Sequence, residues 1–217
     1  MRSGVPSGGY RRDVVVACNT ASAAALKQLR QTFPDVPFVG MEPAVKPAAE
    51  VTRSGVVGVL ATPATFQGEL YASVVERFGQ GVRFVNQTVP GLVEQIEAGY
   101  LDAPETEALI RRALEPILLA GADTIVLACT HYPFVIPLIS RLAGPGVTVI
   151  DPAPAIARQA ARLRQASPSN DPASRGSVVL VTSGDPAGLT RLSLPLLGEQ
   201  AEARRAEWRG ASLELSQ

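Results

Sequence analysis

The two cysteines of the sequence, Cys18 and Cys129, stand in similar contexts. Each ends a run of branched apolar residues and an alanine, and each is followed by small polar residues, in VVVACNT (Val14–Thr20) and IVLACTH (Ile125–His131). Such a run predicts a buried strand, so each thiol is expected at a strand exit, just before a helix. There the helix dipole and free N–H groups favour a thiolate. The pattern therefore points to chemistry by one thiol on each side of a ligand.

Several kinds of chemistry are compatible with this pair. A cysteine is often only a small buried hydrophobe, and a disulfide is disfavoured in a reducing compartment. Zinc held by Cys18, Cys129 and His131 would have only a Cys-x-His spacing, so no metal is predicted. A single nucleophilic cysteine with His131 as its base is a third chemistry. The fourth is two-base proton exchange, in which one thiolate takes a proton from a stereocentre and the other thiol returns one to the opposite face.

No cofactor is indicated by the remaining motifs. Lys27 is expected in mid-helix and Lys46 lies between prolines, so neither resembles a lysine that holds pyridoxal phosphate. The glycine pairs lack the spacing of a dinucleotide or phosphate loop. The sequence therefore predicts chemistry by its own side chains.

Charge and hydropathy narrow the class of protein. Twenty basic residues balance twenty acidic ones, which gives no basic footprint for a nucleic acid. The apolar runs are shorter than the roughly 18 residues that span a bilayer, so no membrane partner is predicted. Arg11-Arg12 before VVVAC imitates an export signal, but its apolar stretch is shorter than the usual 7–15 residues. A cytoplasmic enzyme is the expectation.

The elements that must position the thiols alternate between strands and helices, which predicts an α/β fold. Most of the strands are continuously apolar, as in a parallel sheet covered on both faces. The predicted strands are Asp13–Ala17, Pro37–Gly40, Gly55–Ala61, Val82–Asn86, Thr124–Ala128, Val147–Ile150 and Ser177–Thr182. The predicted helices are Ser22–Thr32, Phe66–Phe78, Gly91–Ala98, Pro104–Ala120, Phe134–Leu142, Ala155–Gln165 and Ala187–Leu197.

The similar halves predict two pseudo-symmetric, parallel-sheet lobes that face a shared cleft. Ligands bind beyond the carboxyl ends of strands in open α/β sheets, and LATPAT and VTSGDP provide two further polar strand exits. The segment 167–176 is expected to be a loop, and ARRAEWRG near the end a charged last helix or a frayed tail. The predicted lobes are a discontinuous first lobe, residues 1–52 plus 155–217, and a second lobe, residues 53–154.

The sequence resembles the glutamate racemases, which belong to the cofactor-independent aspartate/glutamate racemase superfamily. The two ACxT-type motifs mark the superfamily, and GMEPAVKPA and THYP point to the glutamate branch. The matching segments run through nearly the whole chain: Val14–Leu26, Val39–Ala48, Gly58–Thr65, Pro90–Gly99, Val126–Pro133, Asp151–Gln159 and Val181–Pro186.

The resemblance implies a role for each matching residue. Cys18 and Cys129 match the two catalytic cysteines, and His131 would help to ionise Cys129. Glu97 matches an acidic residue that assists near the second thiol or binds an activator. The substrate-binding matches are Asn19, Thr20, Thr62, Thr65 and Thr130. Thr62 and Thr65 also have the spacing of a helix cap. Four other polar residues are interpreted as structural, chiefly caps and turn formers: Glu42, Lys46, Asp151 and Asp185.

The sequence departs from the family's pattern before Cys18. The family begins with a strand that ends in Asp-Ser-Gly, followed by a helix and a Pro-Tyr-Gly loop, whereas Met1–Arg12 is a short Gly/Ser/Pro-rich segment. The first lobe is therefore expected to be N-terminally truncated, through a misassigned start, a shortened gene or a degenerate paralogue. The strand Asp13–Ala17 would then leave an apolar edge exposed. The chain is expected to be a poor racemase, with proton exchange surviving better on the Cys129 side.

The function that the resemblance implies is interconversion of L- and D-glutamate without a cofactor, to supply D-glutamate for peptidoglycan. An aspartate or hydantoin racemase is the alternative within the superfamily. A racemase-like remnant with a binding role is the alternative outside catalysis. Glutamate is thus the expected partner, and homodimers are usual in the family.

Overall fold

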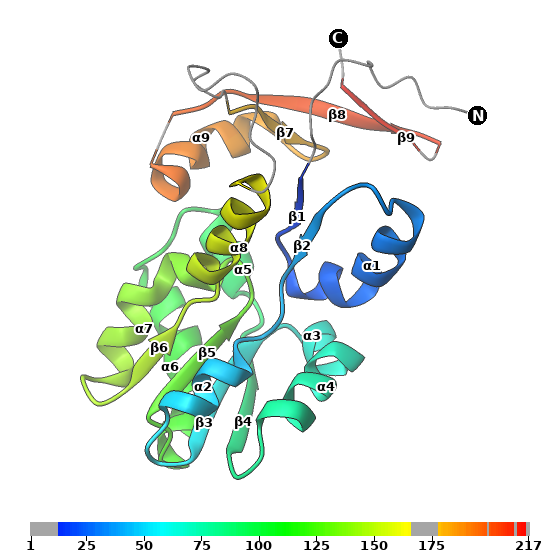
Figure 1. Ribbon diagram of the computed structural model, residues 1–217. Coiled ribbons are helices and arrows are strands. Elements are labelled where there is room, and N and C mark those ends of the chain that lie inside the picture. The colour runs from blue at the N-terminus through cyan, green and yellow to red at the C-terminus, as the bar shows by residue number, and fades with distance from the viewer. Residues whose placement is uncertain (1–12, 166–177, 199, 211, 216–217) are drawn as a thin grey trace.

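The computed structural model describes residues 13–165, 178–198, 200–210 and 212–215, and it has an α/β fold built on parallel strands (Figure 1). The strands are β1 (Val14–Val16), β2 (Phe38–Gly40), β3 (Val56–Ala61), β4 (Arg83–Thr88), β5 (Thr124–Ala128), β6 (Thr148–Ile150), β7 (Leu180–Thr182), β8 (Ala203–Arg209) and β9 (Ser212–Leu215). The helices are α1 (Asn19–Thr32), α2 (Val45–Val51), α3 (Pro63–Gln67), α4 (Glu69–Phe78), α5 (Leu92–Glu97), α6 (Pro104–Leu119), the 3₁₀ helix η1 (Tyr132–Val135), α7 (Ile136–Ala143), α8 (Ala153–Gln165) and α9 (Pro186–Leu197).

A four-stranded parallel sheet, ordered β4-β3-β5-β6, forms the centre of the larger part of the molecule. Alternate residues of its central strands face opposite sides: Leu60 and Leu127 belong to one apolar cluster, whereas Val59 and Val126 belong to another. Helices α5, α6 and α7 contribute to the first cluster, and α2 and α4 contribute to the second. Both faces of this sheet are therefore covered, as the continuously apolar strands predict.

The remaining strands form two smaller sheets. Strand β1 pairs in parallel with β2, and β7 pairs in parallel with β8, which forms an antiparallel hairpin with β9. Among the described residues β1 has no partner on its other edge, and Val14 and Val15 are 37% and 41% exposed. This agrees with the expected apolar edge. Strand β7 lies outside the four-stranded sheet, as predicted, and its partner is β8.

The fold class is confirmed, and seven predicted strands have counterparts in the structure. The predicted helix Phe66–Phe78 is instead two helices, because Gly68 has an extended backbone between α3 and α4. Glycine is a poor helix former, and here it also lies against Ala23 of α1. Helix α2 was not among the predicted helices. A proline in the first turn is compatible with a helix, and Pro47 occupies that turn.

The prediction for ARRAEWRG, a charged helix or a frayed tail, is wrong, because residues Ala203–Arg209 form β8. Gly210 adopts a positive φ of 63° and lets the chain turn back into β9. Helix α9 also anchors the start of β8, where the Ala203 N–H donates to Thr190 Oγ1 at 3.0 Å. Hydrogen bonds to β7, β9 and α9 thus override the helical tendency of Ala, Arg and Glu.

Two further predictions have no direct test in the structure. The expected loop at 167–176 lies outside the described residues, and the boundaries of the two lobes stay a prediction. Across the part of the chain that the structure describes, no helix has the length and apolar character needed to cross a membrane.

Candidate active site

Cys18 lies at the junction between β1 and α1. Its backbone is extended (φ −156°, ψ 128°), and its Sγ accepts a hydrogen bond from the Ala21 N–H at 3.5 Å, so the thiol caps the helix. The position places the sulfur at the positive end of the α1 dipole, beside the N–H groups of the first turn. The prediction of a thiol at a strand exit holds here.

Ser22 fixes the start of α1 next to Cys18. The Ser22 hydroxyl donates to the Val16 carbonyl at 3.1 Å and accepts from the Met41 N–H at 2.9 Å. Its side chain is buried, so both hydrogen bonds are shielded from water. Sequence reasoning treated Ser22 only as part of a helix and missed this role. The small polar residue in the first turn was the available signal.

Cys129 follows β5 and is the more buried thiol, at 8% exposure. Burial raises the pKa of Cys129, whereas hydrogen bonds from the backbone N–H groups of His131 and Tyr132 lower it. The charge of Cys18 also raises this pKa, by less than burial does. Both cysteines are free thiols.

His131 connects Cys129 to a carboxylate. Its Nδ1 lies 3.9 Å from Cys129 Sγ, and its Nε2 lies 2.9 Å from Glu97 Oε1. Glu97 is the last residue of α5, and η1 begins just after His131. The structure therefore places thiol, imidazole and carboxylate in a row. This arrangement can hold a proton released by Cys129 on the imidazole and stabilise the resulting imidazolium.

Three threonines join α1 to the exit of β3. The hydroxyl of Thr20 lies 3.2 Å from those of Thr62 and Thr65, which lie 3.0 Å from each other. Thr62 also caps α3, because its Oγ1 accepts from the Thr65 N–H. The capping and the site interpretations of this pair are thus both consistent with the geometry. The hydroxyl triangle brings the Cys18 helix against the four-stranded sheet.

Asn19 is the one buried polar side chain that stands out. It is 2% exposed, and within the described part of the chain neither Oδ1 nor Nδ2 has a hydrogen-bond partner. An unpaired buried amide costs about 1–3 kcal/mol, so such groups are rare unless a ligand satisfies them. Asn19 directly follows Cys18, which suits an amide that would hold a polar ligand next to the thiol.

Two cavities meet at Thr130, the residue between Cys129 and His131. One, of about 480 Å³, is bordered by Glu97, His131 and the start of α9. The other, of about 330 Å³, is apolar and lies between β1 and α8. Neither thiol lines either cavity. The shared cleft expected between the thiols therefore stays a prediction.

Of the four polar residues interpreted as structural, two are caps or turn formers and two form exposed ion pairs. Asp185 caps α9 by accepting from the Ala187 and Gly188 N–H groups, and Asp151 accepts from the Ala153 N–H. Lys46 pairs with Glu50 at 3.9 Å, and Glu42 pairs with Arg77 at 3.9 Å. Over the described ranges, no three His, Cys, Asp or Glu side chains are placed to hold a metal ion.

A parallel α/β fold with a thiol at two strand exits defines the class of protein, and comparison with known sequences gives the family. The sequence profile of the Asp/Glu/hydantoin racemases matches residues 12–160, and the chain belongs to this family. It is 54% identical over 188 residues to the glutamate racemase of Roseiflexus sp. (strain RS-1), covering 84% of this chain and 69% of that protein. It is 48% identical over 191 residues to the glutamate racemase of Ectopseudomonas mendocina (strain ymp), with coverage of 87% and 72%.

Solved structures show the same likeness. The Escherichia coli glutamate racemase in complex with L-glutamate and the activator UDP-MurNAc-Ala superposes with a TM-score of 0.77 at 31% identity, over 91% of this chain and 75% of that one. The Thermus thermophilus glutamate racemase in complex with β-chloro-D-alanine gives a TM-score of 0.70 at 33% identity, with coverage of 92% and 73%.

Proposed function

We propose that the chain interconverts L-glutamate and D-glutamate by cofactor-independent proton exchange between two thiols, and so supplies D-glutamate for peptidoglycan synthesis. The observation that carries the proposal is the placement of Cys18 and Cys129 at two strand exits, with His131 and Glu97 in line behind Cys129. The Roseiflexus and Ectopseudomonas relatives, at 54% and 48% identity, are glutamate racemases, which supports glutamate over aspartate or a hydantoin. In the cytoplasm, the proposed location, both thiols stay reduced.

In this mechanism the Cα proton moves to one thiolate, and the other thiol donates its own proton to the opposite face of the carbanion. The Cα–H bond breaks on one side and a new one forms on the other. After one turnover the former thiolate is therefore a thiol, and the former thiol is a thiolate. No electrons leave the substrate, and the next turnover runs in reverse or after proton exchange with water.

The two thiols are prepared in different ways. Cys18 relies on the N-terminus of α1 and the Ala21 N–H. Cys129 is buried, which disfavours its thiolate, so it needs His131 to accept its proton and Glu97 to stabilise the imidazolium. A distance of 3.9 Å from sulfur to Nδ1 is within reach for this transfer once substrate tightens the site.

Substrate would be held by the polar residues next to each thiol. The unpaired amide of Asn19 offers one donor group and one acceptor to the substrate's carboxylate and ammonium groups. The hydroxyls of Thr20, Thr62 and Thr65 and that of Thr130 complete the proposed set. Precise orientation of the substrate accounts for a large part of catalysis, since displacing a reacting group by about 1 Å can lower the rate about a hundredfold.

The test is the formation of D-glutamate from L-glutamate by the purified chain, followed by chiral chromatography, with L-aspartate and a hydantoin run in parallel. The proposal is supported if the chain converts glutamate and if C18S and C129S each abolish this conversion. Preferential conversion of aspartate or the hydantoin would assign the alternative substrate. Binding of glutamate without conversion by any preparation would favour the binding role. A homodimer is a separate prediction that sedimentation velocity tests.

A further inference from the structure

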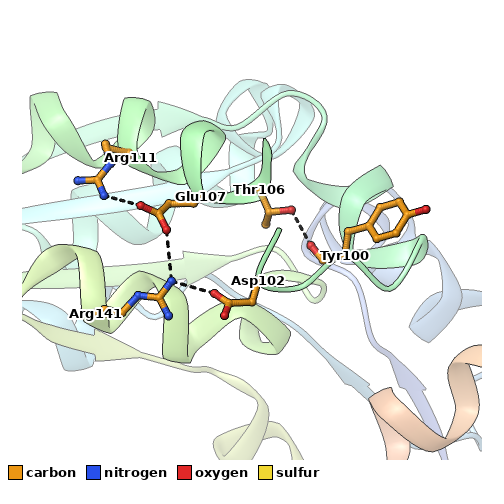
Figure 2. Close-up of polar contacts among 6 residues, drawn as sticks. All are labelled: Tyr100, Asp102, Thr106, Glu107, Arg111 and Arg141. Carbon is orange, nitrogen blue, oxygen red and sulfur yellow. Dashed lines mark hydrogen bonds and ion pairs between the residues drawn. The ribbon is translucent and has the colours of Figure 1, made fainter. Parts of the chain in front are cut away.

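We propose that Arg141 is a positioning residue that holds Glu97 against His131 by tying the loop after α5 to α7; this rests on the proposed function. Arg141 lies in the last turn of α7. Its Nη2 donates to Asp102 Oδ1 at 2.8 Å and to Glu107 Oε2 at 3.3 Å (Figure 2). One guanidinium therefore joins three segments: α7, the α5–α6 loop and the first turn of α6.

These segments continue directly into the two partners of the proton relay. Glu97 ends α5, and the chain then turns at Gly99 (φ 82°) and reaches Asp102 within five residues of Glu97. On the other side, His131 leads into η1 and α7, which carry Arg141. Movement of the loop away from α7 would thus draw Glu97 away from His131.

Two contacts hold this loop: Thr106 anchors its middle, at Tyr100, and Arg141 links its later part, at Asp102, to α7. Thr106 is fully buried, and its hydroxyl donates to the Tyr100 carbonyl (Figure 2) and approaches Gln95 Oε1 at 3.4 Å. These bonds fasten the loop to α6. Asp102, with a side chain 69% exposed, is the contact that fastens it to α7. Exposed ion pairs contribute little to global stability, so Arg141 is suited to local positioning and not to overall stabilisation.

Arg111 offers a matched control on the same network. It pairs with Glu107 one turn away on α6 and does not touch the loop (Figure 2). R111M therefore removes a guanidinium from the same carboxylate and leaves the Asp102–Arg141 link intact. R141M breaks that link, and R141K keeps the charge in a shorter side chain that restores part of it.

The experiment is a double-mutant cycle between Arg141 and Glu97 with glutamate as substrate. We expect R141M to lower kcat about threefold to tenfold with KM nearly unchanged, R141K to recover part of the loss, and R111M to match the parent chain. In the E97Q background R141M should have no further effect, since its action passes through Glu97. Independent losses that multiply in R141M/E97Q, or a loss in R111M as large as in R141M, would overturn the proposal.

A second readout does not depend on activity. His131 is the only histidine, so the ring ¹⁵N spectrum of the labelled protein contains one imidazole and reports its hydrogen bond to Glu97. R141M should shift these signals toward those of E97Q, whereas R111M should leave them in place. Unchanged signals in R141M, with a clear change in E97Q, would refute the positioning role even if the proposed reaction proves to be wrong.

Discussion

Replacing Asp123 should destabilise the protein, because the Asp123 carboxylate makes the hydrogen bonds that fix where the chain enters the four-stranded sheet. Asp123 precedes β5, and its carboxylate binds residues about 70 positions earlier: Oδ1 accepts from Thr52 Oγ1 at 2.6 Å, and Oδ2 accepts from the Arg53 and Ser54 N–H groups at 2.7 and 2.8 Å. The Thr124 hydroxyl donates a fourth bond at 3.0 Å. The segment 52–54 joins α2 to β3, so this carboxylate sets where β3 begins.

The magnitude follows from the charge that an amide lacks. In Asp123→Asn the amide oxygen can still accept from the Arg53 and Ser54 N–H groups, and the N–H₂ group can donate to the Thr52 and Thr124 hydroxyls. Four charge-assisted bonds thus become neutral ones, each weaker by about 1 kcal/mol when shielded. Because the site is half-exposed, we expect a smaller sum, about 2–3 kcal/mol. That corresponds to a fall in Tm of roughly 4–12 °C for a chain of this size.

The assay is urea unfolding at two pH values, with Asp151→Asn as control because, within the described ranges, Asp151 accepts a single backbone bond. Desolvation raises the pKa of Asp123, but the bonds from Thr52, Arg53, Ser54 and Thr124 outweigh it and hold the pKa well below its usual range. Stability from a lowered pKa is present above the unfolded value, about 4, and is lost as pH falls below it. The deficit of the variant should be full at neutral pH and shrink below about pH 4. An equal deficit at both pH values, or none, would refute this reasoning.

Three further perturbations test the packing and the site. Gly58→Ala should lower the free energy of unfolding by about 1–3 kcal/mol, because the added methyl group overlaps a buried side chain of α6, whereas Gly146→Ala, where the space is open, should leave the urea midpoint unchanged. Asn19→Ala should raise KM for glutamate about tenfold without lowering stability, since the amide has no partner among the described residues; a stability loss with unchanged KM would contradict its binding role. Because burial raises the pKa of Cys129 above its ordinary value of about 9, the rate of racemisation should still be increasing with pH at about pH 9 as the thiolate forms; an initial rate that has already levelled off or fallen by that pH would count against a thiolate base.

The fold was predictable where local pattern and burial agree. Thr124–Ala128 is predicted to the residue, because five consecutive apolar or β-branched positions become a strand buried on both faces. Strand β8, near the C-terminus, was not predicted, because its sequence favours a helix and only the hydrogen bonds to β7 and β9 make it a strand. Propensity is a weak guide in a segment whose partners are far away in the chain.

In the candidate site, too, some features could be predicted from the sequence and others could not. The two thiols stand next to their strands, so their positions at strand exits followed from the sequence. Glu97 and His131 are 34 residues apart, and only the family resemblance suggested that they act together. The contacts of Asp123 and Arg141 had no sequence signal, because each depends on tertiary placement of an ordinary surface residue.

The central claim, that two thiols act on opposite faces of one Cα, is tested most directly by racemisation in heavy water. Each enantiomer of glutamate is supplied separately, and deuterium at Cα is measured by mass spectrometry in the remaining substrate and in the product at early conversion. Two bases predict a product that carries deuterium and a remaining substrate that carries almost none, in both directions, because the donating thiol has exchanged with solvent. A product that retains the proton of its own substrate would mean that a single group serves both faces, and it would contradict the account.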